Sequence, residues 1–556
     1  MVTLGLHAFT HDSAAALAVD GRLVAFHQEE RLSRIKGDGA FPTRAIEFCL
    51  REGGIDPAAV DLVVLPFRPG VGAVRRLAYQ LRRPRRGLGA TASLLAKGRA
   101  NLGLSERLRA LGIDAPIRRT DHHQSHARAV FMASGFESAA ILVIDGVAEA
   151  WSGGNFVAHR RPAPAIACRN LIPFPASLGL IYAAVTEHLG FVHNREEGKV
   201  MAMAASGTEE MVTKMGAACR LDGSRLVINP GLFDFGGAWT THRFANIFGP
   251  RRSPSEPIQH RQFALARAVQ KTLEGVATQM ARRLLDESGE RHLCLAGGLA
   301  LNPALNSAIA SGCGADIVYA LPVGGDAGTA IGAALALDAD PDWRLQHAFW
   351  GSTPSPEAID DALAGAGLKP SMVGEGVVAR TAELLAEGSI GGWFRGSSEM
   401  GPRALGHRSI FADPRKGTSR TRLNQDIKRR EAFQPFGPAI LLEACDEIFP
   451  GLGPSPFMLR TWPVADTWRD RIPAVIHTDG TSRPQTVTAG DGSGLDDLLR
   501  AFADRTGLPL LLNTSLNRRG EPLTEYPEDA IAVFLETGLD FLVLEDRLIV
   551  RNERAT

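Results

Sequence analysis

The sequence predicts an α/β protein with two domains, the first of them internally duplicated. Its 556 residues are too many for one ordinary core. Short apolar runs typical of strands alternate with longer segments of helical periodicity. A strand, a turn with an acid and a second strand form the N-terminus, and the same layout returns near residue 139. Together these observations indicate an α/β domain of two similar halves with a cleft between them.

The elements of the first domain follow from its apolar runs. Residues 2–6 and 14–19 predict two strands joined by the polar turn HAFTHDS, and residues 21–31 predict a third strand. The segment SAAILVIDGVAEAWSGGNFVAHR repeats this layout in the second half. Helical spacing over 262–286 leads into the strand HLCLAGG. The basic stretch 75–100 is expected to be a solvated helical excursion.

The second domain begins after a segment with linker composition. Residues 338–357 are rich in Asp, Pro and Ser, which favours an irregular connection. We therefore expect a first domain over residues 1–345 and a second over residues 355–556.

Composition and charge limit the partners and the location. Apolar residues make up 45% of the chain and charged residues 22%, as in ordinary soluble proteins. The 61 basic and 61 acidic residues balance, so nothing at this level indicates a nucleic-acid or membrane partner. Six scattered cysteines without a CxxC pair argue against a disulfide framework, and the absence of a signal-type apolar run predicts a cytoplasmic protein.

The segment DHHQSHARAV carries the first candidate site. In a helix, His122 and His126 share one face, whereas His123 lies about 100° around the axis. Asp145, at the end of an apolar strand, and Asp326, in a glycine turn, are candidate third and fourth metal ligands. Such a set would suit iron, zinc or manganese. The alternatives are a histidine-rich cap without an ion and acids that cap helices.

Two glycine-rich turns follow strands in the same domain. LAGGLALN contains Gly297, Gly298 and Asn302, and VGGDAGTA contains Gly325. Glycines let backbone amides approach phosphates, and the helix that follows favours an anion at its N-terminus. Neither turn matches a Walker or Rossmann pattern, but as a pair they resemble the phosphate and adenosine loops of an actin-like ATPase.

The second domain contains a dense group of cations. Between residues 395 and 430 the basic residues are Arg395, Arg403, Arg408, Arg415, Lys416, Arg420, Arg422, Lys428, Arg429 and Arg430. Interleaved with Gly-Pro turns, they predict a site for a ligand with several phosphates. Downstream, Arg483 adds a cation, and Asn513 and Ser515 follow an apolar strand, where they could bind phosphate or carbamoyl oxygens or only form a turn.

Eight motifs give the chain a family resemblance. They are HDSAAAL, DHHQSHA, EEGKVMAMA, AGGLALN, GPRALGHRSIFADPR, NQDIKRREAFQPF, SRPQTV and LNTSLNRRGEP. In this order, they resemble the signatures of the O-carbamoyltransferase family of nodulation and antibiotic-biosynthesis proteins over almost the whole chain. The resemblance implies an actin-like, metal-binding domain, similar to the catalytic subunit of the tRNA threonylcarbamoyladenosine machinery, followed by a YrdC-like domain.

The resemblance also implies roles for particular residues. It places His122, His126, Asp145 and Asp326 where the family binds its metal, usually iron. It places His11 and Asp12 in the acceptor and transfer site, and Lys199 at the cleft of the first domain. Arg403, Lys428, Arg483 and Ser515 fall in the site for carbamoyl phosphate and ATP. The chain departs from the family at His7, where Asn is common, and in the shortened EEGKVMAMAASG.

The expected activity is ATP-dependent carbamoyl transfer with Mg²⁺. Carbamoyl phosphate and ATP would give carbamoyladenylate, whose carbamoyl group would pass to a hydroxyl of a small natural product such as an antibiotic or its sugar. His11 is the candidate base and Asp12 would orient it. The alternatives are an actin-like sugar kinase, a threonylcarbamoyl-type tRNA enzyme, which the neutral charge fits poorly, and a nucleotide-sensing regulator.

Overall fold

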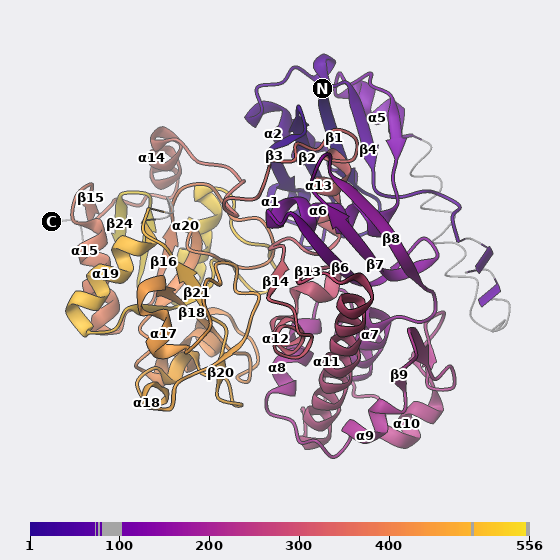
Figure 1. The fold of residues 1–556 in the computed structure, drawn as a ribbon. Coiled ribbons are helices and arrows are strands. Elements are labelled where there is room, and N and C mark those ends of the chain that lie inside the picture. The colour runs from indigo at the N-terminus through magenta and orange to yellow at the C-terminus, as the bar shows by residue number, and fades with distance from the viewer. Residues whose placement is uncertain (73, 76–77, 80–102, 491–493, 552–556) are drawn as a thin grey trace. The chain divides into compact units, whose positions relative to one another are not determined.

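A computed structural model describes residues 1–72, 74–75, 78–79, 103–490 and 494–551 (Figure 1). Most of the basic stretch 75–100 therefore lies outside the described residues. The chain forms two compact units: the first comprises Met1–Glu30 and Gly37–Leu345, and the second comprises Arg31–Lys36 and Gln346–Thr556. Within the part of the chain that the structure describes, no helix has the length and apolar character needed to cross a membrane.

The first unit contains two five-stranded sheets of the same design. One has the order β3-β2-β1-β4-β5, with strands β1 (Val2–His7), β2 (Ala14–Val19), β3 (Arg22–Gln28), β4 (Leu62–Leu65) and β5 (Ile117–Arg119). The other has the order β14-β13-β6-β7-β8, with strands β6 (Ser138–Ala148), β7 (Trp151–His159), β8 (Ala165–Pro173), β13 (His292–Ala296) and β14 (Ile317–Ala320). In each sheet three antiparallel strands are extended by two parallel ones. The duplication predicted from the sequence is confirmed.

The third strand is shorter than predicted. It ends at Gln28, and the short helix α1 (Glu29–Ser33) follows. The buried carboxylate of Glu29 accepts a hydrogen bond of 2.8 Å from the amide of Ala45, in the first turn of helix α2 (Thr43–Glu52). The end of the predicted strand therefore satisfies a free helix amide instead of extending the sheet.

The helices of the first unit include one with unusually close neighbours. Besides α2, they include α5 (Leu104–Ala110), α6 (His122–Ser134), α7 (Leu178–His188), α8 (Glu197–Ala204), α9 (Val212–Gly216), α10 (His242–Phe248), α11 (His260–Ser288), α12 (Pro303–Gly312) and α13 (Thr329–Ala334). Helix α13 packs against both β1 and α6. A Cβ atom at Gly332 would lie 1.9 Å from the carbonyl oxygen of Ser125 in α6, and one at Gly5 would lie 2.1 Å from that of Ala330. Only glycine permits these approaches.

Two small hairpins also belong to the first unit. They are β9 (Cys219–Asp222) with β10 (Arg225–Ile228), and β11 (Phe233–Asp234) with β12 (Trp239–Thr240).

The second unit is built on one eight-stranded mixed sheet of order β15-β24-β23-β16-β17-β22-β18-β21. Its strands are β15 (Met372–Val373), β16 (Gly391–Phe394), β17 (Arg408–Ala412), β18 (Gly437–Leu441), β21 (Gln485–Val487), β22 (Leu510–Ser515), β23 (Phe541–Leu544) and β24 (Arg547–Val550), and β19 (Trp462–Pro463) pairs with β20 (Thr481–Ser482) apart from them. Its helices are α14 (Pro356–Gly365), α15 (Val377–Glu387), α16 (Gly417–Arg422), α17 (Cys445–Ile448), α18 (Asp466–Arg469), α19 (Leu495–Thr506) and α20 (Pro527–Glu536). The predicted α/β class is confirmed for both units.

Candidate metal centre and anion site

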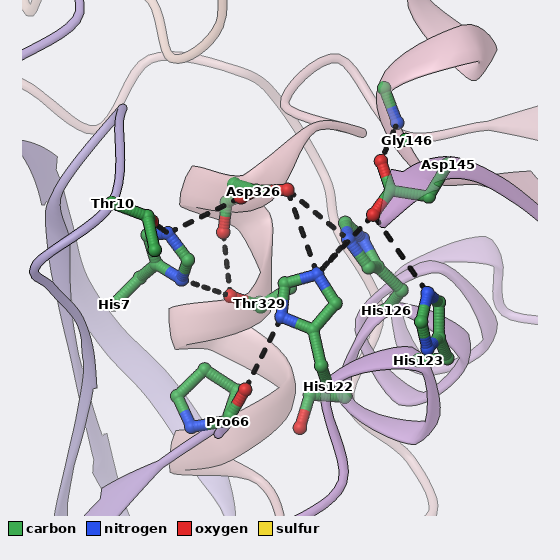
Figure 2. A network of polar contacts seen from close by, with 12 residues as sticks. His7, Thr10, Pro66, His122, His123, His126, Asp145, Gly146, Asp326 and Thr329 are labelled. Carbon is green, nitrogen blue, oxygen red and sulfur yellow. Dashed lines mark hydrogen bonds and ion pairs between the residues drawn. The ribbon is translucent and has the colours of Figure 1, made fainter. Parts of the chain in front are cut away.

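Four side chains predicted as metal ligands meet in the first unit (Figure 2). His122 and His126 lie on the first two turns of α6, Asp145 lies in β6, and Asp326 lies in the turn before α13. One ligand atom from each lies within 4.8 Å of the others. Asp121 starts α6 by accepting a hydrogen bond of 2.9 Å from the amide of Gln124, which fixes the direction of both histidines.

The distances in this group suit donors around one ion. His122 Nε2 lies 3.1 Å from His126 Nε2, 3.5 Å from Asp145 Oδ2 and 3.6 Å from Asp326 Oδ1. Ligand atoms at about 2.0–2.2 Å from a transition metal are separated by comparable distances. Two imidazoles and two carboxylates, nearly buried, therefore fit a divalent ion such as iron, zinc or manganese.

Asp326 faces histidines on both sides. Its Oδ1 points to His122 and His126, while its Oδ2 lies 3.5 Å from His7 Nε2 and 3.7 Å from His11 Nε2. His11 Nδ1 lies 2.8 Å from Asp12 Oδ2. The turn between β1 and β2 thus brings the predicted transfer residues beside the metal group.

The charges of this group shift several pKa values. Burial alone would lower the pKa of His122, but the carboxylates of Asp145 and Asp326 raise it well above its usual value. Burial also opposes ionisation of Asp326, yet His11 and His122 hold its pKa well below the usual range. For His11, Asp326 and Asp12 outweigh burial and raise the pKa to about 9. By contrast, burial lowers the pKa of His7 to about 4.

The amides of the first glycine turn form hydrogen bonds within the protein. The amide of Gly297 donates to the carbonyl oxygen of Gly324 at 3.1 Å, and the amide of Gly298 donates to Asp145 Oδ1 at 3.3 Å. Gly297 has φ +88°, and a Cβ atom there would lie 2.3 Å from the carbonyl oxygen of Ile144. In this structure the two amides position Asp145 and the turn that bears Asp326. A phosphate-binding role for Gly297 and Gly298 stays a prediction. Gly325, in that turn, accepts a backbone bond from Gly328.

Two further predicted cofactor residues also have internal partners. The side chain of Asn302 caps α12 by accepting from the amide of Leu305 at 3.0 Å, and donates to Gln270 Oε1 at 3.0 Å. Lys199 Nζ lies 2.7 Å from a carboxylate oxygen of Glu196. Both contacts give these side chains structural roles in the first unit.

In the second unit, arginines from separate loops lie close enough to affect the pKa of Arg483. Arg403 lies between β16 and β17, Arg430 follows α16, and Arg483 precedes β21. Burial, then Arg403 and Arg430, hold the pKa of the Arg483 guanidinium well below its usual value, and burial lowers the pKa of Arg403 to about 10. Within the described ranges, Arg483 Nε has no hydrogen-bond partner, and Arg483 forms no ion pair with a carboxylate. A partly buried cation with cationic neighbours and no carboxylate partner favours an anionic ligand.

Lys428 and Ser515 are brought together, as the resemblance implies, but Lys428 already has partners. The buried Lys428 Nζ donates to Asn517 Oδ1 at 2.7 Å and to Ser515 Oγ at 3.2 Å. It also donates to the backbone oxygens of Ser515 and Asn517. Burial, with Arg430 and Lys36 adding repulsion, holds the pKa of Lys428 well below its usual value. In this structure its ammonium shapes the turn after β22.

Glu399, which holds the loop after Arg403, escaped the sequence prediction. One carboxylate oxygen of Glu399 accepts hydrogen bonds from the amides of Leu405, His407 and Arg408 at 2.7, 3.0 and 3.0 Å. The amide of buried Asn513 donates to the carbonyl oxygen of Ala404 at 3.2 Å, so its side chain also supports this loop. Only the position of Glu399 inside the cation-rich segment could have drawn attention to it.

Comparison with known proteins identifies the family to which the chain is similar. Two family models match, described as the N-terminus of carbamoyltransferases over residues 2–335 and the C-terminus of carbamoyltransferases over residues 382–551. The nodulation protein NolNO of Sinorhizobium fredii is 34% identical, covering 98% of this chain and 79% of its own. Nodulation protein U of Bradyrhizobium diazoefficiens is 29% identical, covering 94% of this chain and 93% of its own.

A further relative and a solved structure are also similar to this chain. An uncharacterised protein of Synechocystis is 36% identical and covers 99% of this chain and 96% of its own. A solved HypF structure in the phosphate- and nucleotide-bound form shares 13% identity over 60% of this chain and 46% of its own, with a TM-score of 0.34. That score is too low to support an argument. By both family models and by its relatives, the chain belongs to the carbamoyltransferase family.

Proposed function

We propose that the protein is an ATP-dependent O-carbamoyltransferase that acts on a hydroxyl of a small natural product, such as an antibiotic or its sugar. Family membership supports carbamoyl transfer. The observation that carries the donor half is Arg483, a cation held beside Arg403 and Arg430 without a carboxylate partner among the described residues. Carbamoyl phosphate and the phosphates of Mg²⁺-bound ATP have the complementary charge.

The second unit would be the YrdC-like domain, and the donor reaction would take place there. Water releases phosphate from carbamoyl phosphate and leaves carbamate. A carbamate oxygen then attacks the α-phosphorus of ATP, which forms carbamoyladenylate and expels pyrophosphate. Arg403, Arg430 and Arg483 would hold both substrates and neutralise the charge that develops on the leaving pyrophosphate.

The first unit would be the actin-like domain, and the transfer reaction would take place there. The acceptor hydroxyl attacks the carbamoyl carbon, and AMP leaves. His11 would take the hydroxyl proton, and Asp12 would orient it through the 2.8 Å contact at Nδ1. With a pKa of about 9, His11 is protonated at neutral pH, because Asp326 is ionised beside it. A cation that neutralises Asp326 would favour the neutral form that a base needs.

A metal fits this unit. His122, His126, Asp145 and Asp326 would hold it, because their donor atoms converge within 4.8 Å. A bound divalent ion, Fe²⁺ by family resemblance, would supply Lewis-acid polarisation.

The test is to incubate the purified protein with carbamoyl phosphate, Mg²⁺ and ATP, without an acceptor, and to identify the nucleotides by mass spectrometry. Carbamoyladenylate, or AMP with pyrophosphate, is the expected product. Arg483→Ala should abolish it, whereas Arg518→Ala should not, because Arg518 is paired with Glu521 and Glu536. Formation of ADP alone would overturn the proposal in favour of a sugar kinase.

A further inference from the structure

Asp145 is contacted on both carboxylate oxygens. Its Oδ1 accepts the amide hydrogen bond of Gly298 at 3.3 Å. Its Oδ2 lies 3.5 Å from Nε2 of His122 and 3.8 Å from Nε2 of His123 (Figure 2). The carboxylate therefore lies between a backbone amide, a histidine of the metal group and a third histidine outside that group.

His123 is buried without satisfying its own polar atoms. Its relative exposure is 0%, and neither ring nitrogen has a hydrogen-bond partner within the described part of the chain. An unsatisfied buried polar group costs about 1–3 kcal/mol, which a phenylalanine at the same place would avoid. The group that Nε2 faces is Asp145.

A purely structural histidine in the same unit looks different. His188 is also buried, at 2% exposure, but Nδ1 lies 3.0 Å from Thr240 Oγ1 and Nε2 lies 3.0 Å from the carbonyl oxygen of Gly249. Both of its nitrogens are satisfied within the core. The contrast indicates that the unsatisfied Nε2 of His123 serves Asp145 and is not a leftover of packing.

We propose that His123 is a positioning residue that orients Asp145 for a metal ion. Its Nε2, 3.8 Å from Asp145 Oδ2, is the donor that faces this oxygen and would orient it when an ion binds, while the amide of Gly298 donates to Oδ1 from the other side. His123 is not itself a ligand, since it lies outside the group whose donor atoms converge. The inference rests on the metal centre of the proposed function and adds a residue to it. Partners of this kind change metal affinity by about 10–100-fold.

The experiment measures metal affinity, not turnover. Metal-stripped full-length protein is titrated with Zn²⁺ against a chromophoric chelator, and with Fe²⁺ under anaerobic conditions. The variants are His123→Phe, His123→Asn and His123→Gln, with His188→Asn as a buried control. Gln carries its amide nitrogen near the position of Nε2, whereas Asn carries it near Nδ1.

We expect His123→Phe and His123→Asn to bind about 10–100-fold more weakly than wild type, and His123→Gln and His188→Asn to bind within about threefold. The rise in Tm on adding Zn²⁺ should follow the same order, which separates lost metal binding from misfolding. Wild-type affinity in His123→Phe would overturn the inference and leave the metal centre intact, as would an equal loss in His188→Asn. If the wild type itself bound neither ion, the metal centre of the proposed function would fail as well.

Discussion

Arg483 is a side chain whose charge opposes folding and favours ligand binding. Burial and two neighbouring arginines hold its pKa below the usual value, so its charge is unfavourable in the ligand-free protein. We predict that Arg483→Met raises the Tm while it lowers pyrophosphate release by at least about 100-fold. Inorganic phosphate should raise the Tm of the wild type but not of the variant. A lower Tm in Arg483→Met would contradict this account.

Glu399 supports the arginine site without contacting a ligand. Its carboxylate accepts three amide hydrogen bonds from the loop that follows Arg403. Glu399→Ala leaves these amides without a partner, so the variant should lose about 2 kcal/mol of stability and show a raised KM for carbamoyl phosphate. The exposed Glu447 offers a control, since Glu447→Ala should change neither quantity. An unchanged KM would limit Glu399 to a role in stability.

At the scale of single residues, the sequence predicts those site residues that a local spacing pattern indicates. The i, i+4 histidines point to one ion because helix geometry alone places them on one face, and the acids at strand ends follow from the layout of an α/β sheet. The contact of His7 with Asp326, and the three bonds of Glu399, have no local pattern. They depend on where distant segments meet in the fold.

Among the elements, α13 shows how small residues place a site. The backbone oxygen of Ser125 in α6 lies 1.9 Å from where a Cβ atom of Gly332 would be. Gly332→Ala should therefore destabilise the protein by about 1–3 kcal/mol and weaken metal binding, because α6 carries His122 and His126. Denaturant unfolding and metal titration would measure both effects.

A matched substitution in α11 should have the opposite effect. Nothing lies within 4 Å of a Cβ atom at Gly275, which is inside that helix. Gly275→Ala should stabilise the protein by about 0.5–1 kcal/mol through helix propensity alone. If both variants were equally stable, close packing would not be what requires Gly332.

Element boundaries were predicted well where apolar runs are isolated, as for β1, β2 and α11. The third strand was extended too far because Glu29 and Glu30 follow an apolar run without a turn signal. For the glycine turns, the sequence shows that a backbone amide can approach a ligand closely, but it does not show that the amide of Gly298 donates to Asp145.

For the whole molecule, four buried histidines predict sensitivity to acid. Burial lowers the pKa of His7 and His188 to about 4 and of His123 and His407 to about 3. Between pH 6.5 and 4 the unfolded chain binds protons that the folded protein does not, so stability falls as pH falls, by up to about 1.4 kcal/mol per pH unit for each histidine.

Thermal unfolding of the metal-free protein from pH 6.0 to 5.0 checks this prediction, because His11 and His122, whose pKa values are raised in the folded protein, oppose the effect mainly above about pH 6.5. The Tm should drop on acidification, and His188→Asn should make the drop shallower because one titrating group is removed. A Tm that stayed constant over this range would show that these histidines are protonated in the folded protein.

Residues 31–36 belong to the second unit, and neither the composition nor the periodicity of the sequence predicts this assignment. Arg31 donates to the carbonyl oxygen of Gly401 and Arg34 to that of Leu523, while the flanking residues belong to the first unit. A gene fragment that begins at codon 346 would therefore encode the second unit without six of its residues. Splitting the chain into two genes at that point would separate the second unit from a part of its own fold.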